Sequence, residues 1–149
     1  MNRLSNAVFA AAALMLFVDA ACAIEAPLPK VGMWETRMQH SADGKAANPP
    51  AVMQHCLDAA AVSHGKQTGD DYIRKNCSKY EVHQDGSTWI VDMVCKNGPS
   101  TTTSHSVTTS SGADASHTEL TSTYEPARPG LTRDVTTIDR KWLGECKPE

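Results

Sequence analysis

The chain has 149 residues, with 14 lysines and arginines against 17 aspartates and glutamates, which gives a net charge of −3 when the histidines are neutral. This length suits a single domain, and the mild acidity leaves no basic patch for nucleic acid or an anionic membrane. Aromatic residues make up only 5% of the chain, so we expect a thin hydrophobic core.

The first 23 residues have the pattern of a signal peptide. Arg3 supplies a positive charge, residues 6–18 are almost wholly apolar, and Ala21-Cys22-Ala23 is a cleavage site of the A-x-A type. The apolar run is about a dozen residues long, whereas a membrane-spanning helix needs about 20. The flanks also argue against a buried core helix. We therefore expect cleavage after Ala23, export to the periplasm, and one β-rich domain over residues 24–149 without a transmembrane segment.

Cys22 raises the alternative of a lipid anchor, because acylated cysteines also end such segments. The residue three positions before a lipidated cysteine is normally aliphatic, whereas here it is Asp19. We therefore disfavour a lipoprotein.

The first predicted strand follows the proline-rich start of the domain. Residues 31–39 (VGMWETRMQ) alternate, with Trp34, Thr36 and Met38 on one face, as in a half-buried strand. The polar residues 40–50, which include a glycine and two prolines, predict a loop.

A second short strand and a short helix come next. Residues 51–57 (AVMQHCL) predict the strand. Asp58 is well placed to accept the free first-turn N–H groups of a helix over residues 59–63. Residues 65–71 (GKQTGDD) predict another loop.

Residues 76–96 predict a β-hairpin. Asp85-Gly86 is a dipeptide typical of a two-residue type I′ turn, and this turn would place Val82 opposite Trp89 and Lys79 opposite Asp92. One face of the hairpin then collects the apolar side chains, which are Tyr80, Val82, Trp89, Val91 and Met93.

Serine and threonine supply 15 of the 24 residues from Ser100 to Thr123. Such a stretch could be a low-complexity linker, but threonine favours strands, and Val107 and Leu120 interrupt the polar run. We expect two solvated strands with a turn at Gly112, continuing the hairpin through a turn at Asn97-Gly98.

A turn at residues 126–130 and a last strand over residues 131–146 complete the predicted fold. The fold class is mainly β, an antiparallel meander curled toward a barrel or half-barrel, with one short helix and two disulfides.

These features together resemble a known family. "KVGMWE" near the start of the domain, cysteines before and after a short helix, a strand with Trp89 and Cys95, and "WLGEC" at residues 142–146 resemble the Domain of Unknown Function 3617 family, which comprises small periplasmic proteins of Gram-negative bacteria. The resemblance spans roughly residues 31–146, with Val31 where the family often has proline. It implies export, a β-rich fold and paired cysteines, and it brings no catalytic residues.

The four cysteines after the signal peptide predict a disulfide framework with three possible connectivities. Chain order suggests the pairs Cys56–Cys77 and Cys95–Cys146, the second of which would tie the C-terminal tail to the middle of the sheet. A free reactive thiol is the alternative, and an oxidising compartment disfavours it.

Three histidines on predicted neighbouring strands raise the possibility of a copper or zinc site: His83, His105 and His117. A three-residue loop around Gly112 would put His105 and His117 on one face, whereas a loop of two or four residues would separate them. No local metal-binding spacing occurs, so we interpret these histidines as solvated.

No catalytic motif marks the chain as an enzyme, and we interpret the adjacent Asp70 and Asp71 as solvated loop residues or helix caps. We expect a non-enzymatic protein without a cofactor that binds a small molecule or an envelope partner, with metal binding as the alternative and a hydrolase ranked last. Four aromatic residues would line any cavity, although a core needs the same residues: Trp34, Tyr80, Trp89 and Trp142.

Overall fold

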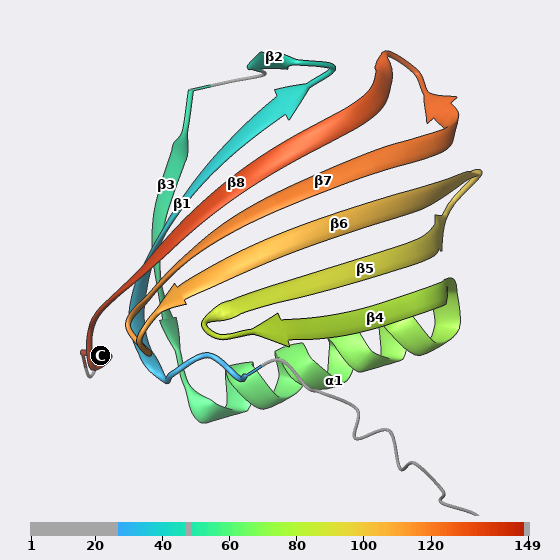
Figure 1. The fold of residues 1–149 in the computed structure, drawn as a ribbon. Helices are drawn as coiled ribbons and strands as arrows, with labels where there is room; N and C mark the ends of the chain where they lie inside the picture. Colours follow the sequence, from blue (N-terminus) through green and yellow to red (C-terminus); the bar gives the residue numbers. More distant parts are fainter. Residues whose placement is uncertain (1–26, 47–48, 148–149) are drawn as a thin grey trace, which may run out of the picture.

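The computed structural model describes residues 27–46 and 49–147, so the predicted signal peptide and Cys22 lie outside the described residues. The described chain forms an eight-stranded antiparallel sheet in the order β2-β1-β8-β7-β6-β5-β4, with β3 paired to β1. Figure 1 shows a strongly curved, unclosed sheet, with one helix running under its concave face from β3 to β4. The predicted mainly β, half-barrel fold is confirmed. The elements are β1 (Gly32–Ala42), β2 (Lys45–Ala46), β3 (Ala51–Leu57), α1 (Ala59–Asn76), β4 (Cys77–Asp85), β5 (Thr88–Asn97), β6 (Ser100–Ser111), β7 (Ala115–Arg128) and β8 (Leu131–Gly144).

The first strand keeps the predicted alternation, because Trp34 and Thr36 are both buried. The predicted loop over residues 40–50 is wrong in its first half. Strand β1 continues to Ala42, turns at Asp43-Gly44 and returns as β2. Both turn residues have positive φ, +48° and +80°, which aspartate tolerates and glycine adopts freely.

Helix α1 begins where it was predicted to begin but is much longer. The Asp58 carboxylate accepts a hydrogen bond from the Ala61 N–H at 2.6 Å, which confirms the N-cap. The helix then runs through Gly65 and Gly69 to Asn76, so the predicted loop at residues 65–71 is wrong. None of its residues is buried, so packing on the sheet contributes little to its stability.

The β4–β5 hairpin is confirmed, but its predicted register is wrong by two residues. Val82 lies opposite Val91, and Gly86-Ser87 form the turn. Gly86 takes a φ of +56° at the first turn position, where a hairpin turn of the II′ type also has its glycine. Because the shift is even, the predicted apolar face keeps its members.

The cysteines form two disulfides, and neither is a pair that chain order suggested. Cys77 bonds to Cys95 across the β4–β5 hairpin, and Cys56 near the end of β3 bonds to Cys146 just after β8. The C-terminal tail is therefore tied to the edge strand β3 and not to the middle of the sheet.

The serine- and threonine-rich segment forms the two predicted strands, β6 and β7, and its hydroxyls bond across them. The Oγ atoms of Ser104 and Ser122 lie 3.0 Å apart, and the Oγ1 atoms of Thr108 and Thr118 lie 2.9 Å apart. All four side chains belong to the concave face by register. This face therefore has few bulky side chains to fill its interior.

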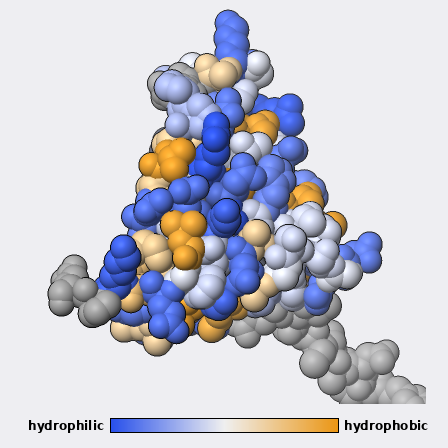
Figure 2. Space-filling view, turned by 90° about the vertical axis from the view of Figure 1, so that its left-hand side faces the viewer, coloured by the Kyte–Doolittle hydropathy of each residue, from blue (hydrophilic) through white to orange (hydrophobic). Residues whose placement is uncertain are grey.

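The burial of the described residues shows the same polar interior. The buried apolar residues are Trp34 and Cys95, whereas the buried polar residues all carry hydroxyls: Thr36, Ser100, Ser104, Ser122 and Thr136. On the β3 side of the molecule, apolar side chains lie between hydrophilic ones without merging into one patch (Figure 2). The space under the sheet is therefore incompletely filled by side chains.

Candidate ligand cavity

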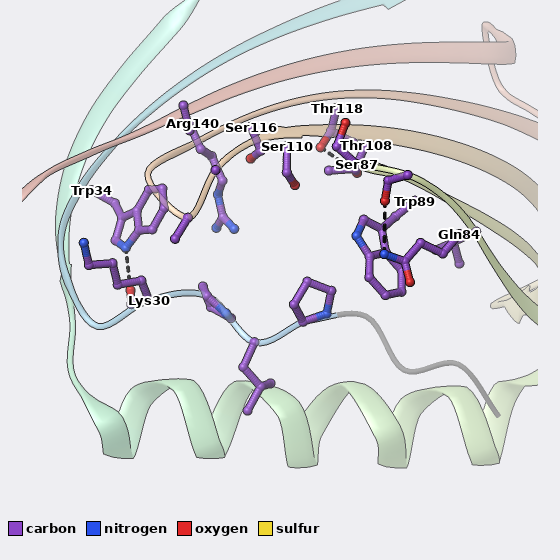
Figure 3. A pocket seen from close by; sticks show the side chains of 18 residues that line it. Lys30, Trp34, Gln84, Ser87, Trp89, Thr108, Ser110, Ser116, Thr118 and Arg140 are labelled. Carbon is purple, nitrogen blue, oxygen red and sulfur yellow. Dashed lines mark hydrogen bonds between the residues drawn. The ribbon is translucent and has the colours of Figure 1, made fainter. Parts of the chain in front are cut away.

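A cavity of about 710 Å³ lies under the concave face of the sheet, bounded by the N-terminal residues 27–30. Figure 3 shows this segment running between the sheet and α1, with the lining side chains pointing into the space between them. The lining includes Leu28, Lys30, Trp34, Trp89, Val91 and Arg140.

The strand register explains why residues far apart in sequence meet in this cavity. Arg140 on β8 lies opposite Ser116 on β7, which in turn lies opposite Ser110 on β6. Residues opposite one another across a ladder share a face, so this row points into the concave side. The neighbouring row, two residues along, brings Trp89, Thr108 and Thr118 to the same side.

Aromatic side chains lie toward the two ends of the cavity (Figure 3). Trp34 is only 5% exposed, and its indole N–H donates a hydrogen bond of 2.7 Å to the Lys30 carbonyl. Trp89 is half-buried beside Val91. Of the four predicted ligand-binding residues, Trp34 and Trp89 belong to the lining.

The other two predicted residues lie outside the lining. Tyr80 on the edge strand β4 is 44% exposed. Trp142 instead anchors the N-terminal segment: its indole N–H donates to the Val31 carbonyl at 3.1 Å, and the Lys30 ammonium lies 3.4 Å from its ring centroid. Lys30 also forms an ion pair of 2.8 Å with Asp114. Trp142 thus holds one wall of the cavity in place.

Arg140 is the residue that the sequence reasoning missed. Its guanidinium points from the sheet into the cavity (Figure 3), it is half-buried, and no side chain in the described residues forms an ion pair or hydrogen bond with it. A signal existed in the sequence, since Ile138, Arg140 and Trp142 alternate along the last strand. That period of two puts the cation on the same face as the two apolar side chains.

A buried hydroxyl without a partner lies next to Arg140. Thr36 lies opposite Arg140 across the β1–β8 ladder. It is 4% exposed, and its Oγ1 has no hydrogen-bond partner among the described residues, whereas buried hydroxyls normally have one. Thr36 is not part of the cavity lining.

The three candidate metal-binding histidines lie on the opposite, convex face. The loop at Gly112–Asp114 has three residues, which puts His105 and His117 on the same side. However, His105 Nδ1 lies 2.8 Å from an Asp92 oxygen, and His117 Nδ1 lies 2.6 Å from an Asp139 oxygen. In the part of the chain that the structure describes, no three histidine, cysteine or acidic side chains are placed to hold a metal ion.

Asp92 was predicted to face Lys79, and this prediction is wrong. The register shift pairs Asp92 with Glu81 across the ladder, and Lys79 instead lies 3.1 Å from the Glu81 carboxylate. The hydrogen bond with His105 lowers the pKa of Asp92 below its usual value of 3.8.

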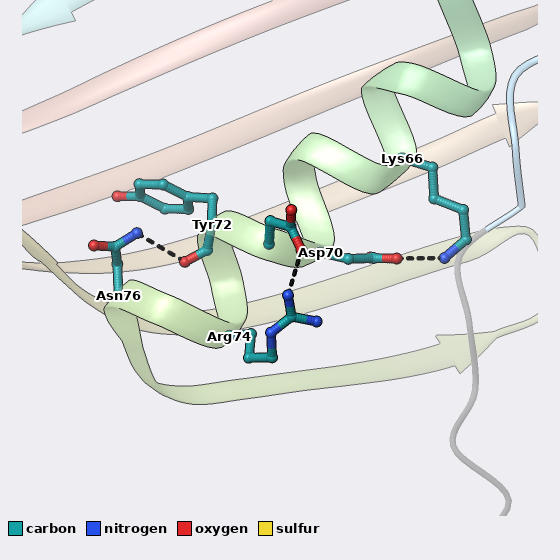
Figure 4. Close-up of polar contacts among 6 residues, drawn as sticks. Lys66, Asp70, Tyr72, Arg74 and Asn76 are labelled. Atoms are coloured by element: carbon teal, nitrogen blue, oxygen red, sulfur yellow. Dashed lines mark hydrogen bonds and ion pairs between the residues drawn. The ribbon is translucent and has the colours of Figure 1, made fainter. Parts of the chain in front are cut away.

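A second, shallow hollow lies on the exposed surface of α1, where charged side chains pair with one another (Figure 4). Lys66 bonds to Asp70 at 2.6 Å, and Arg74 bonds to Asp71 at 2.5 Å. Asp70 and Asp71 are therefore helical residues in ion pairs, and the predicted loop position for them is wrong.

The comparisons with known proteins give one finding. A family model described as "Protein of unknown function (DUF3617)" matches residues 29–146, from the N-terminal wall of the cavity to the last cysteine. No curated protein and no solved structure matches the chain. No helix in the described ranges is long and apolar enough to cross a membrane.

Proposed function

The chain belongs to the DUF3617 family, whose function is unknown, and we propose that it is an exported, non-enzymatic protein that binds a small molecule in the cavity under its sheet. The observation that carries this proposal is the cavity itself. Its volume of about 710 Å³ falls within the range of about 300–1,000 Å³ found for small-molecule sites. Its walls combine aromatic and apolar side chains with hydroxyls and two cations, and polar groups within a partly apolar lining orient the ligand in such sites.

The character of the lining supports binding rather than catalysis. The titratable side chains among the lining residues are the two cations, Lys30 and Arg140. A serine or threonine hydroxyl becomes a nucleophile only beside a general base. The lining contains hydroxyls but no carboxylate, imidazole or thiol to serve as that base, and Lys30 is already paired with Asp114.

Export to the periplasm of a Gram-negative bacterium is supported by the signal-peptide pattern of the first 23 residues and by the two disulfides. Disulfides of this kind persist in oxidising compartments. N-terminal sequencing of the protein from a periplasmic fraction should begin at Ile24. Recovery from the cytoplasm with the leader intact would contradict export.

The alternatives have weaker support. Copper or zinc binding needs His83, His105 and His117 to converge, and the ion pairs of His105 and His117 draw these two rings toward separate carboxylates. A large apolar patch marks many protein–protein interfaces, and the β3 side of the molecule shows scattered apolar side chains instead (Figure 2).

A cavity-filling variant tests the proposal. The protein, expressed with its own N-terminus and purified from the periplasm of a bacterial host, is titrated with the fluorescent probe 1-anilinonaphthalene-8-sulfonate. Ser116→Phe should weaken binding at least about tenfold, because the ring occupies the space beside Arg140. Thr123→Phe adds the same ring to an exposed convex-face position of the same strand and should leave binding unchanged. No saturable binding, or equal binding by Ser116→Phe and the unmodified chain, would contradict the proposal.

A further inference from the structure

We propose that the ligand is an amphipathic organic anion, whose acidic group binds Arg140 and whose apolar body extends toward Trp89; this rests on the proposed binding function. Such a ligand has an acyl chain or an aromatic body and carries one carboxylate, phosphate or sulfonate.

The first step is the unpaired charge of Arg140. Arg140 is half-buried, its guanidinium points into the cavity, and no described side chain forms an ion pair or hydrogen bond with it. The guanidinium fork matches the oxygens of a carboxylate or phosphate. A bound anion would supply the missing partner.

The second step is the distribution of charge around the cavity. Lys30 is the other cation of the lining, and Asp114 already neutralises it at 2.8 Å. The lining contains no aspartate or glutamate, although the chain as a whole has a net charge of −3. An anion at Arg140 therefore meets no repulsion from the cavity wall.

The third step is the set of hydroxyls beside Arg140. Ser110 and Ser116 lie in the same cross-strand row and line the cavity. Neither hydroxyl has a hydrogen-bond partner within the described residues. Two hydroxyl donors and a guanidinium on one wall can satisfy the several acceptor oxygens of an acidic group.

The fourth step is the apolar remainder of the lining. Trp89 and Val91 come from β5, and Pro27, Leu28 and Pro29 come from the N-terminal segment. Of these, Trp89 lies at the opposite side of the cavity from Arg140 (Figure 3). Leu28 is 56% exposed, and a ligand between it and Trp89 would remove both from water. One polar end and one apolar end select an amphipathic molecule.

Two probes that differ only in an acidic group test whether the cavity prefers an anionic ligand. 1-Anilinonaphthalene-8-sulfonate and N-phenyl-1-naphthylamine share one ring system, and only the first carries an acidic group. The unmodified chain should bind the sulfonate at least about tenfold more tightly than the neutral probe, as expected for one charge-assisted pair. Arg140→Gln should reduce that ratio to about one, whereas Arg140→Lys should keep most of it. Lys141→Gln, which removes a charge from the convex face of the same strand, should leave the ratio unchanged.

Displacement of the bound sulfonate then separates the sources of the anion. Decanoate represents a free fatty acid, decyl phosphate represents a lipid headgroup, and decanol is the neutral control. Displacement by either acid and not by decanol supports the proposal. The acid that displaces the sulfonate at the lower concentration indicates the source of the anion. Equal displacement by decanol overturns it.

The outcomes distinguish this inference from the proposed function. If both probes bind equally and Arg140→Gln changes neither affinity, the cavity binds small molecules but the anionic class is wrong. If neither probe binds the folded chain, the proposed function itself fails. Thermal unfolding of each variant confirms that it is folded.

Discussion

Gly32 lies directly against the indole of Trp142. A Cβ added to Gly32 would be 2.1 Å from Trp142 Nε1 and 2.5 Å from the Gly144 carbonyl oxygen. The two motifs at opposite ends of the domain, residues 30–35 and 142–146, therefore form one junction. That junction fixes the N-terminal wall of the cavity, since the same indole also contacts Lys30.

Replacement of Gly32 by alanine should destabilise the protein by about 2 kcal/mol or more. The glycine has a φ of +137°, which strains any residue with a Cβ, and the added methyl overlaps Trp142. Gly69→Ala is the matched control, because no atom lies within 4 Å of its added Cβ and alanine favours a helix by up to about 1 kcal/mol. Urea unfolding should show loss of stability for the first variant and none for the second. Equal stabilities would contradict the packing of this junction.

The two disulfides should differ in their effect on stability. Cys56–Cys146 joins residues 90 apart in sequence, and Cys77–Cys95 joins residues 18 apart. Restriction of the unfolded chain predicts a loss of about 4–5 kcal/mol for the double serine variant of the first pair and about 3 kcal/mol for the second. Denaturant unfolding of the two double variants measures this difference. Mass spectrometry of unreduced peptides checks the pairs themselves, and a Cys56–Cys77 peptide would contradict the structure.

Asp43 should make the protein sensitive to acid. Its carboxylate accepts hydrogen bonds from the Thr132 hydroxyl and from the backbone N–H groups of Arg133 and Thr132. These bonds, with the Thr132 hydroxyl as the largest cause, lower the pKa of Asp43 below its usual 3.8. A lowered pKa in the folded state gives stability that is complete above 3.8 and is lost as the pH falls through the lower folded value.

The measurement for Asp43 is the urea midpoint between about pH 6 and about pH 2. In Asp43→Asn, the urea midpoint should fall less steeply with pH in the range below pH 3.8. If the urea midpoint of this variant falls with pH as it does in the unmodified chain, the turn between β1 and β2 does not contribute to the acid sensitivity.

Helix α1 should be the least protected element against amide hydrogen exchange. None of its residues is buried, and the ion pairs that support it lie on its exposed surface (Figure 4). Segments with few buried contacts open locally at low free energy. Exchange within Ala59–Asn76 should therefore be faster than in β6 and β7. Equal protection would indicate that the helix packs on the sheet more firmly than the structure shows.

The sequence predicted every strand except β2, because the others carry an alternation or turn signal of their own. It predicted the start of α1 through Asp58, but not its length, because Gly65 and Gly69 are typical of loops. The pair Lys66–Asp70, spaced by four residues, favours the helix across these glycines. Such weak helical contacts are hard to weigh against glycine from the sequence alone.

The disulfide pairs were predicted from chain order, and the predicted hairpin register did not correct them. Asp85-Gly86 and Gly86-Ser87 are both acceptable turn dipeptides, and the structure uses the second. In the predicted register Cys77 would have faced Val94. The two-residue shift and an irregularity between Cys77 and Lys79 place Cys77 opposite Cys95 instead. A bulge of this kind has no signature in a single sequence.

Two of the four residues predicted to line a cavity do so. Trp34 and Trp89 were predicted from the apolar faces of their strands, and both line the cavity. The contribution of Leu28 and Lys30 depends on where the N-terminal segment runs, which only the tertiary structure shows. Trp142 was predicted as a cavity residue but has a supporting position, because Lys30 and Val31 occupy its surface.

The most direct test of ligand binding under the sheet is the indole N–H signal of Trp89 in a ¹⁵N–¹H correlation spectrum during titration with decanoate. Binding in the cavity predicts a saturable shift of this signal and of the side-chain Nε–H of Arg140, with unchanged amides at His105 and His117 on the convex face. Shifts confined to the convex face, with Trp89 and Arg140 unmoved, would contradict the cavity as the binding site.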